Sequence, residues 1–454
     1  MSAYFMQRIR SLLQHYNRYS DEVTEKLIIK EYYHFLKLSL FYPSLKSPIT
    51  AGIHLLQFII YVVVLGIQNV LGIISIIKSN PEDFLLVMNI GQFGLLSTLL
   101  MLIIIMFNAT RYEFCMSHKM IGDGVYTYEG EEVPSDDYLL MTMKYKSIKR
   151  KLMITHLCIN LSVAPVILLI KPWMDEKYGS ENLRTYTNSG FNTILPLAGW
   201  YPFDTHQGLY FYLALLEQAF CGYIIIIIVA SFVSYYFTST IQIIIQLERL
   251  ILSIKNLNER AISLYKKTVL TASTDNFRGC KIFEDDPVFM ECLKFCFRQN
   301  IQHHQQILRL IRLVNTVWKV PLFLSFLAEG IVLGISAMVV IFGAERPGVA
   351  LGTLSIAVAE LVNITTVCKL AQTITDLNEK LHLITYDIPW YQFSRNLQRS
   401  VCIVQEMTCQ ELCLEGLFNT KANMETYSKT LNAAYSFFTL LHSRSLKKQS
   451  YQKG

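Results

Sequence analysis

Three acidic side chains lie inside long apolar runs of this 454-residue chain. They are Glu217, Glu329 and Glu360, and each is surrounded by residues suited to a hydrocarbon environment. A charge at membrane depth is costly, so such a carboxyl faces protein or water by default and suggests a functional role. Two interpretations stay open. The acids either brace helix packing as neutral or hydrogen-bonded groups, or they belong to an ion path or a ligand site.

Residues that could carry out catalysis are not arranged as in any known enzyme motif. The sequence has no Walker loop, no HExxH zinc helix, no nucleophile elbow and no glycine fingerprint after a strand. Cys292/Cys296 and Cys409/Cys413 are pairs one helical turn apart, and only His303 and His304 lie near enough in sequence to complete a zinc site. We therefore expect no catalytic residue, no metal and no cofactor.

The composition is that of a membrane protein. Hydrophobic residues make up 52% of the chain and charged residues 17%, with a mean hydropathy of +0.32, whereas a soluble chain is usually about 25% charged. The formal charge of +6 is scattered among acids, and no segment combines a basic stripe with stacking aromatics, so nucleic-acid binding has no support. The N-terminus does not resemble a signal peptide, so the first spanning helix must direct membrane insertion.

Apolar runs predict the membrane-spanning helices, each of which needs about 20 residues. The seventh run is the weakest, because Glu425, Lys429 and Asn432 interrupt it, and a soluble core helix is the alternative there. The predicted spans are 53–77, 84–107, 152–170, 209–237, 320–342, 349–371 and 424–442.

Lys and Arg gather on one side of these spans, in residues 1–50, 108–151 and 238–319. Positive residues mark the cytoplasmic side, so we predict a cytoplasmic N-terminus and, after seven spans, an extracellular C-terminus. Helix-period apolar residues fill much of 238–319 and extend helices four and five into the cytoplasm. The polar stretch 271–286 is predicted to connect them. The predicted extracellular loops contain none of the ten Cys residues, so no structural disulfide is expected.

Three stretches of sequence resemble one known family. Residues 195–204 read Leu-Pro-Leu-Ala-Gly-Trp-Tyr-Pro-Phe-Asp, and residues 300–308 read Asn-Ile-Gln-His-His-Gln-Gln-Ile-Leu. The third stretch combines Trp390-Tyr391 with Met-Glu-Thr-Tyr at 424–427 and Ala-Ala-Tyr-Ser-Phe-Phe-Thr-Leu-Leu at 433–441. In this order and on this topology, the segments are similar to those of the insect odorant receptors.

The end of the last helix indicates the branch of that family. The related gustatory receptors end in Thr-Tyr, five apolar residues and Gln-Phe, whereas this chain has Ala434-Tyr435 and Leu441-His442 at the corresponding positions. The chain also lacks the long acidic second cytoplasmic insertion and the terminal Gln-Leu-Lys of the universal coreceptor. The resemblance therefore implies a tuning subunit, the member that recognises the ligand.

The resemblance implies a nonselective cation channel gated by a small volatile organic ligand. Such a channel is a heterotetramer with the odorant receptor coreceptor, embedded in membrane lipid in the plasma membrane of olfactory neuron dendrites. Residues 1–371 would carry helices one to six, while 238–319 and 372–423 would form a cytoplasmic anchor. Residues 424–442 would line the pore, and 443–454 would be a short tail.

The resemblance also implies two sets of site residues. If helices two, three, four and six form a pocket in the outer half of the membrane, helix-spaced residues should line it. On the last helix, an apolar ring from four subunits could close a pore by dewetting, although core packing explains the same stripe. The ligand-binding candidates are Val87, Met88, Gly91, Leu161, Ala164, Leu168, Tyr212, Leu216, Thr353 and Ile356. The pore candidates are Leu431, Tyr435, Phe438, Leu441 and His442, with Leu440 as the alternative to Leu441 at the gate.

Two other classes of membrane protein remain as alternatives. A G-protein-coupled receptor also has seven spans, but its N-terminus lies outside, and this sequence lacks Asp-Arg-Tyr after helix three and Asn-Pro-x-x-Tyr in helix seven. A secondary transporter would show an internal repeat with broken helices, and no such repeat is present. An N-terminal tag exposed on intact cells would favour the first class. Saturating substrate flux without ligand-gated current would favour the second.

Overall fold

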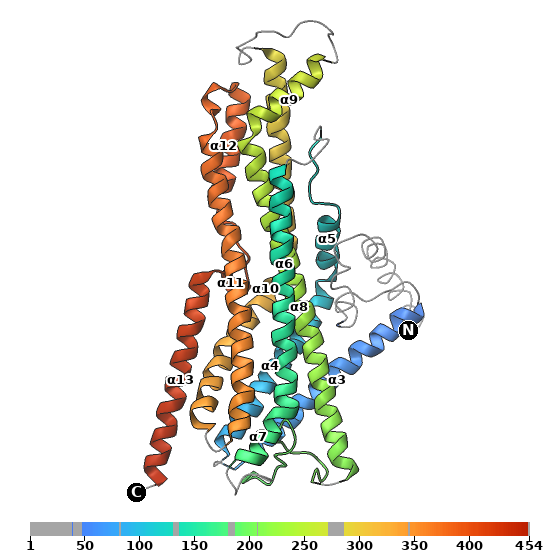
Figure 1. Cartoon of the computed structure of the whole chain (residues 1–454), viewed down its shortest axis with the longest axis vertical. Helices are drawn as coiled ribbons and strands as arrows, with labels where there is room; N and C mark the ends of the chain where they lie inside the picture. The colour runs from blue at the N-terminus through green and yellow to red at the C-terminus, as the bar shows by residue number, and fades with distance from the viewer. Residues whose placement is uncertain are drawn as a thin grey trace, which may run out of the picture.

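The computed structural model describes residues 48–80, 83–129, 136–179, 187–206, 208–270, 286–343 and 346–452, together with Ser39. Within these ranges the chain is helical, apart from connecting segments, which include an isolated bridge between Glu415 and Lys421. The long helices run side by side in an elongated bundle (Figure 1). The predicted all-α fold is confirmed. The predicted connector 271–286 lies outside the described residues except for Asp286.

Every predicted span falls within a helix of the structure. Among the described residues, six helical segments are long and apolar enough to cross a membrane, and α13 (Met424–Gln452) is the more polar seventh. Glu425 and Lys429 pair with each other on its first turns, which explains the weak seventh signal. The six segments are α3 (Pro48–Lys78), α4 (Phe84–Ala109), α6 (Asp136–Pro165) continued by a π-helical turn (Val166–Ile170) and α7 (Lys171–Tyr178), α8 (Leu209–Lys255), α10 (Pro287–Phe342) and α11 (Pro347–Asp387).

Helices α8 and α10 are far longer than a membrane requires. They have 47 and 56 residues, which gives lengths of roughly 70 and 84 Å, against a hydrocarbon core of about 30 Å. Both therefore continue past the span, as predicted. Shorter helices α9 (Leu257–Leu270) and α12 (Arg395–Cys409) lie at this extended end of the bundle, away from α7 (Figure 1). Helix α5 (Arg111–Gly122) packs against the flank of α10.

An aromatic cluster joins the helices at the middle of the bundle. Phe107 of α4, Tyr235 of α8 and Trp318 of α10 are at most 2% exposed. Their ring centroids lie 5.6 to 5.9 Å apart, with the Tyr235 and Trp318 rings stacked. Aromatic pairs at such distances stabilise by about 0.5–1.5 kcal/mol beyond their buried area. The cluster therefore fixes three long helices to one another where they leave the predicted membrane region.

Helix α13 packs mainly along α10 at the edge of the bundle (Figure 1). Two glycines of α10, Gly330 and Gly334, lie one turn apart beneath it and let the two backbones approach closely. A Cβ at Gly334 would lie only 3.0 Å from the carbonyl oxygen of Ala434. The C-terminal end of α13 points to the same end of the bundle as α7 (Figure 1).

Residues 187–206 form a non-helical segment over the α7 end of the bundle. Asp83 accepts hydrogen bonds from the backbone nitrogen and hydroxyl of Ser189, at 2.7 and 2.5 Å. The Asn192 amide donates to the carbonyl of Thr205 at 2.8 Å, and the Trp200 nitrogen donates to the Ser75 hydroxyl at 2.7 Å. These bonds hold the segment against α3 and α4, where it can close a space between the helices.

Candidate ligand cavity

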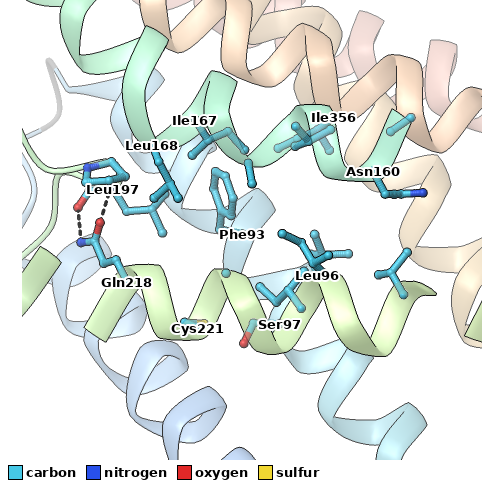
Figure 2. Close-up of a pocket in the computed structure, with 18 of the residues that line it drawn as sticks. Phe93, Leu96, Ser97, Asn160, Ile167, Leu168, Leu197, Gln218, Cys221 and Ile356 are labelled. Carbon is cyan, nitrogen blue, oxygen red and sulfur yellow. Dashed lines mark hydrogen bonds between the residues drawn. The ribbon is translucent and has the colours of Figure 1, made fainter. Parts of the chain in front are cut away.

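A cavity lies between α4, the third span (α6 with its π turn), α8 and α11, and its empty space, including the part open to solvent, is about 950 Å³. Its middle is apolar. Phe93 and Leu96 of α4 face Ile167 and Leu168 of the third span, with Ile356 of α11 beside them (Figure 2). Concave sites with mainly apolar walls are typical of small-molecule sites.

One end of the cavity is closed by Pro196 and Leu197 of the segment before α8. Gln218 of α8 binds the backbone of Leu197 with both ends of its amide (Figure 2): Oε1 accepts from the nitrogen and Nε2 donates to the oxygen, each at 2.9 Å. The same Nε2 also donates to the Tyr201 hydroxyl at 3.0 Å. The amide is thus saturated by protein, and it braces this wall of the cavity.

A buried charged group supports the same wall from outside the cavity. The Lys171 ammonium donates to the carbonyl oxygen of Pro196 at 2.5 Å. Asp175, one turn later, accepts from the backbone nitrogens of Gly348 and Val349, at 2.7 and 3.4 Å. A carboxylate at a helix N-terminus is favoured by the helix dipole, so α7 caps α11. A Cβ at Gly348 would lie 2.1 Å from the Lys171 oxygen, so only glycine fits.

The opposite end of the cavity is polar. Asn160 of α6 lies there in Figure 2, at the far side from Gln218, and Glu360 of α11 also lines the wall. The Asn160 amide donates to the His156 carbonyl at 2.8 Å. The cavity therefore has one end sealed by internal hydrogen bonds, an apolar body, and a second end with a carboxyl group.

Three of the ten predicted ligand-binding residues line this cavity: Ala164, Leu168 and Ile356. The third span contributes 160, 163, 164, 167 and 168, which is one helical face. Leu161 lies one position off that face and is 47% exposed.

The other predicted ligand-binding residues lie elsewhere. Tyr212 and Leu216 of α8 are each 66% exposed, because the cavity face of α8 begins at Gln218. Thr353 is buried and donates to the Val349 carbonyl at 2.7 Å. On α4, Val87 and Gly91 are half-buried away from the lining, and Met88 packs on a separate cluster of Ile335, Val339 and Val349.

Several cavity residues were missed by the ligand-site prediction. Phe93 and Gln218 line the cavity but were not among the predicted ligand-binding residues. Asn160 and Gln68 also line the cavity. Asn160 and Gln68 are polar side chains inside apolar runs, and the same pattern singled out Glu360.

The other two intramembrane acids have different surroundings. Glu217 accepts a hydrogen bond from the Tyr201 hydroxyl at 2.9 Å, and the Gln68 amide nitrogen reaches it at 3.1 Å in its favoured orientation. This matches the interpretation that Glu217 braces packing. Glu329 of α10 precedes Gly330, which faces Thr430 of α13.

The six predicted pore residues all lie on α13. Phe438 stacks on His442 with ring centroids 5.7 Å apart, and His442 also contacts Phe342 of α10 at 5.6 Å. Leu431 and Leu441 are half-buried, whereas Tyr435 and Leu440 are 67% and 51% exposed. Helix α13 therefore presents a partly aromatic face that this chain leaves uncovered.

Comparisons with known proteins agree with this architecture. A family model described as 7tm Odorant receptor matches residues 139–435. Odorant receptor 85b of Drosophila melanogaster is 23% identical over 141 residues, which is 31% of this chain and 36% of the relative. Odorant receptor 67a of the same species is 23% identical over 138 residues, 30% of this chain and 34% of the relative. The alignments thus span about a third of each curated relative.

A solved structure shows the same fold over most of the chain. The insect olfactory receptor OR5 from Machilis hrabei superposes with a TM-score of 0.70 at 12% identity, covering 91% of this chain and 97% of that one. Its complex with eugenol gives 0.61 at 11% identity, covering 95% and 99%. Because the family model covers more than half of the chain, the protein belongs to the odorant receptor family, whose members are multi-pass membrane receptors rather than enzymes.

Proposed function

We propose that this receptor is a tuning subunit of a ligand-gated, nonselective cation channel, and that the cavity holds its ligand. The cavity carries the proposal, because a concave space with mainly apolar walls suits a small volatile molecule. Ala164, Leu168 and Ile356 are the proposed contacts. The solved relative determined in complex with eugenol supports a small organic ligand.

The packing of α11 supports coupling between the cavity and the proposed pore. Helix α11 contributes Ile356 and Glu360 to the cavity wall, and it packs on both α10 and α13. A ligand that moves α11 therefore acts on α13 without an intermediate loop. Four copies of α13 would bring Leu431, Tyr435, Phe438 and Leu441, with Leu440 and His442 beside it, around one axis. Such an apolar ring closes a pore by dewetting.

The exposed face of α13 also supports assembly with other subunits. We propose a heterotetramer with the odorant receptor coreceptor, placed in the plasma membrane of olfactory neuron dendrites with its N-terminus in the cytoplasm. The extended ends of α8 and α10, together with 372–423, would form the cytoplasmic anchor. Membrane lipid would cover the outward side chains of α3, which include Ile59, Val63 and Ile73 at 49–58% exposed.

Paired substitutions on the third span test the cavity. Leu168→Ala removes side-chain volume from the cavity wall, whereas Leu169→Ala alters a neighbour that is 69% exposed and outside the lining. Cells expressing the chain with and without a coreceptor would be recorded against a volatile panel. Losing about 1–2 kcal/mol of apolar contact should raise the EC50 of the active ligand roughly five- to thirty-fold for Leu168→Ala.

The control should behave like the wild type at equal surface expression. If both substitutions leave the dose-response curve unchanged, the ligand does not occupy this cavity. If volatile ligands evoke no current with any subunit combination although the chain reaches the surface, the channel proposal itself fails.

A further inference from the structure

The polar groups that face the cavity differ in how fully the protein satisfies them. Gln218 is saturated by Leu197 and Tyr201, and the nitrogen of Asn160 is used by the His156 carbonyl. Glu360 is different, because it brings a carboxyl group to a wall that is otherwise mostly apolar. Among the described residues that line the cavity, none is Lys, Arg or His.

The neighbours of Glu360 orient it as a hydrogen-bond acceptor. The Asn363 oxygen faces Nδ1 of His156 at 2.8 Å, and Nε2 of the same ring lies 3.2 Å from the Thr366 hydroxyl. The amide nitrogen of Asn363, three positions after Glu360 on the same helix, is therefore the end of that amide which can donate to Glu360.

A second acid lies close enough for its charge to act on Glu360. Glu329 of α10 interacts electrostatically with Glu360 across the helix interface. Its Oε2 atom is buried and has no hydrogen-bond partner within the part of the chain that the structure describes. Two nearby carboxyl groups repel when both are ionised. A cation in the cavity would pair with a Glu360 carboxylate, and no described side chain of the wall supplies one.

Building on the proposed function, we propose that the cavity selects a small organic amine, whose protonated nitrogen donates to Glu360 while its apolar body packs along Phe93, Leu168 and Ile356. The polar and apolar ends of the cavity match the two parts of such a molecule. A neutral alcohol of the same skeleton would fill the apolar part but would offer Glu360 no charge. The sealed Gln218 end leaves only one polar end for the ligand.

Phenethylamine and phenethyl alcohol are suitable probes, because they share a carbon skeleton and differ in the head group. Both would be tested on the full chain with a coreceptor, at a pH where the amine is protonated. The wild type should respond to the amine at a lower concentration than to the alcohol. Glu360→Gln keeps the shape and removes the charge, so it should raise the amine EC50 roughly ten- to a hundred-fold and shift the alcohol EC50 by less than about threefold.

Two further variants keep the test decisive. Glu360→Asp restores the charge and should recover part of the amine response, which separates ligand recognition from misfolding. Glu217→Gln changes another intramembrane acid, which does not line the cavity, and should leave the amine-to-alcohol ratio unchanged. Surface expression would be measured for each variant.

Equal shifts for amine and alcohol in Glu360→Gln would overturn the inference. The inference would also be overturned if the wild type responded to other volatiles, did not discriminate between the two probes, and did not favour amines in a wider panel. Both outcomes leave the proposed ligand-gated channel intact. A surface-expressed channel silent to every volatile would instead refute the proposed function.

Discussion

Replacing Gly334 with Ala should force α13 away from α10. The added Cβ would lie 2.7 Å from Cδ1 of Phe437 and 3.0 Å from the carbonyl oxygen of Ala434, whereas carbon atoms pack best at about 3.5–4.0 Å. The phenyl ring can rotate, but the backbone oxygen moves only with the helix. Gly330, one turn earlier on the same helix, is the matched control, because its Cβ would meet Thr430 at an ordinary 3.7 and 3.8 Å.

The expected magnitude follows from these contacts. Overpacking a close interface costs about 1–3 kcal/mol, and replacing Gly with Ala inside a helix returns about 0.5–1 kcal/mol. Gly330→Ala should therefore stabilise the receptor by about 0.5–1 kcal/mol. Gly334→Ala should lower the stability of the receptor by up to about 2.5 kcal/mol. The stabilities of the two variants should therefore differ by about 1–3 kcal/mol, although the chemical change is identical.

Two measurements check this prediction. Thermal unfolding of detergent-purified receptor should rank Gly330→Ala above wild type and Gly334→Ala below it or level with it. Ligand-independent current per surface-expressed channel should change only for Gly334→Ala, because only that variant displaces the proposed pore helix. If both variants unfold at one temperature and carry the wild-type basal current, α13 is not held by close packing at Gly334.

Substitutions at three other positions give separate expectations. Leu441→Ser should wet the closed pore and raise basal current, while Leu441→Phe should not; a Ser variant that reaches the surface and stays silent would exclude Leu441 as the gate. Gln218→Leu removes three hydrogen bonds, and at about 0.5–1.5 kcal/mol each it should lower thermal stability and expose 195–201 to protease; unchanged proteolysis would contradict this. Burial holds the pKa of His118 at about 4, against an ordinary 6.5, so protonation favours the unfolded chain. Up to about 3 kcal/mol of stability, present above pH 6.5, should be lost as the pH falls toward 4. The free energy of unfolding should therefore depend less on pH over that range in His118→Gln.

The helices were predictable from sequence because length and hydropathy suffice to locate them. The extensions of α8 and α10 were equally readable, since apolar residues continue there at helix spacing. The face of α4 that points toward the cavity could not be predicted in the same way. Helix α4 is apolar on nearly every side, so periodicity does not say which face meets a ligand. The predicted face at Met88 packs toward α10, while the cavity face begins at Phe93.

The polar residues of the cavity show a different limit. Glu360 stood out as an acid in an apolar run, and Asn363 lies one turn later on the same helix. The neighbouring Glu329, however, comes from packing between α10 and α11, which no local pattern encodes. Gln218 likewise acts on Leu197, 21 positions away. The useful rule is that polar side chains inside the spans locate the site better than helix-spaced apolar residues do, since only they need a specific partner.

The unbroken course of α8 gives the receptor a mechanical property. Between the cavity residue Gly222 and the end of the helix at Lys255 there is neither Pro nor Gly, so this half behaves as a stiff lever of roughly 50 Å. A rotation of about 5° at the cavity would displace the far end by roughly 4 Å. In this way a small ligand in the cavity can displace residues at the opposite end of the receptor, because the length of the helix amplifies the rotation.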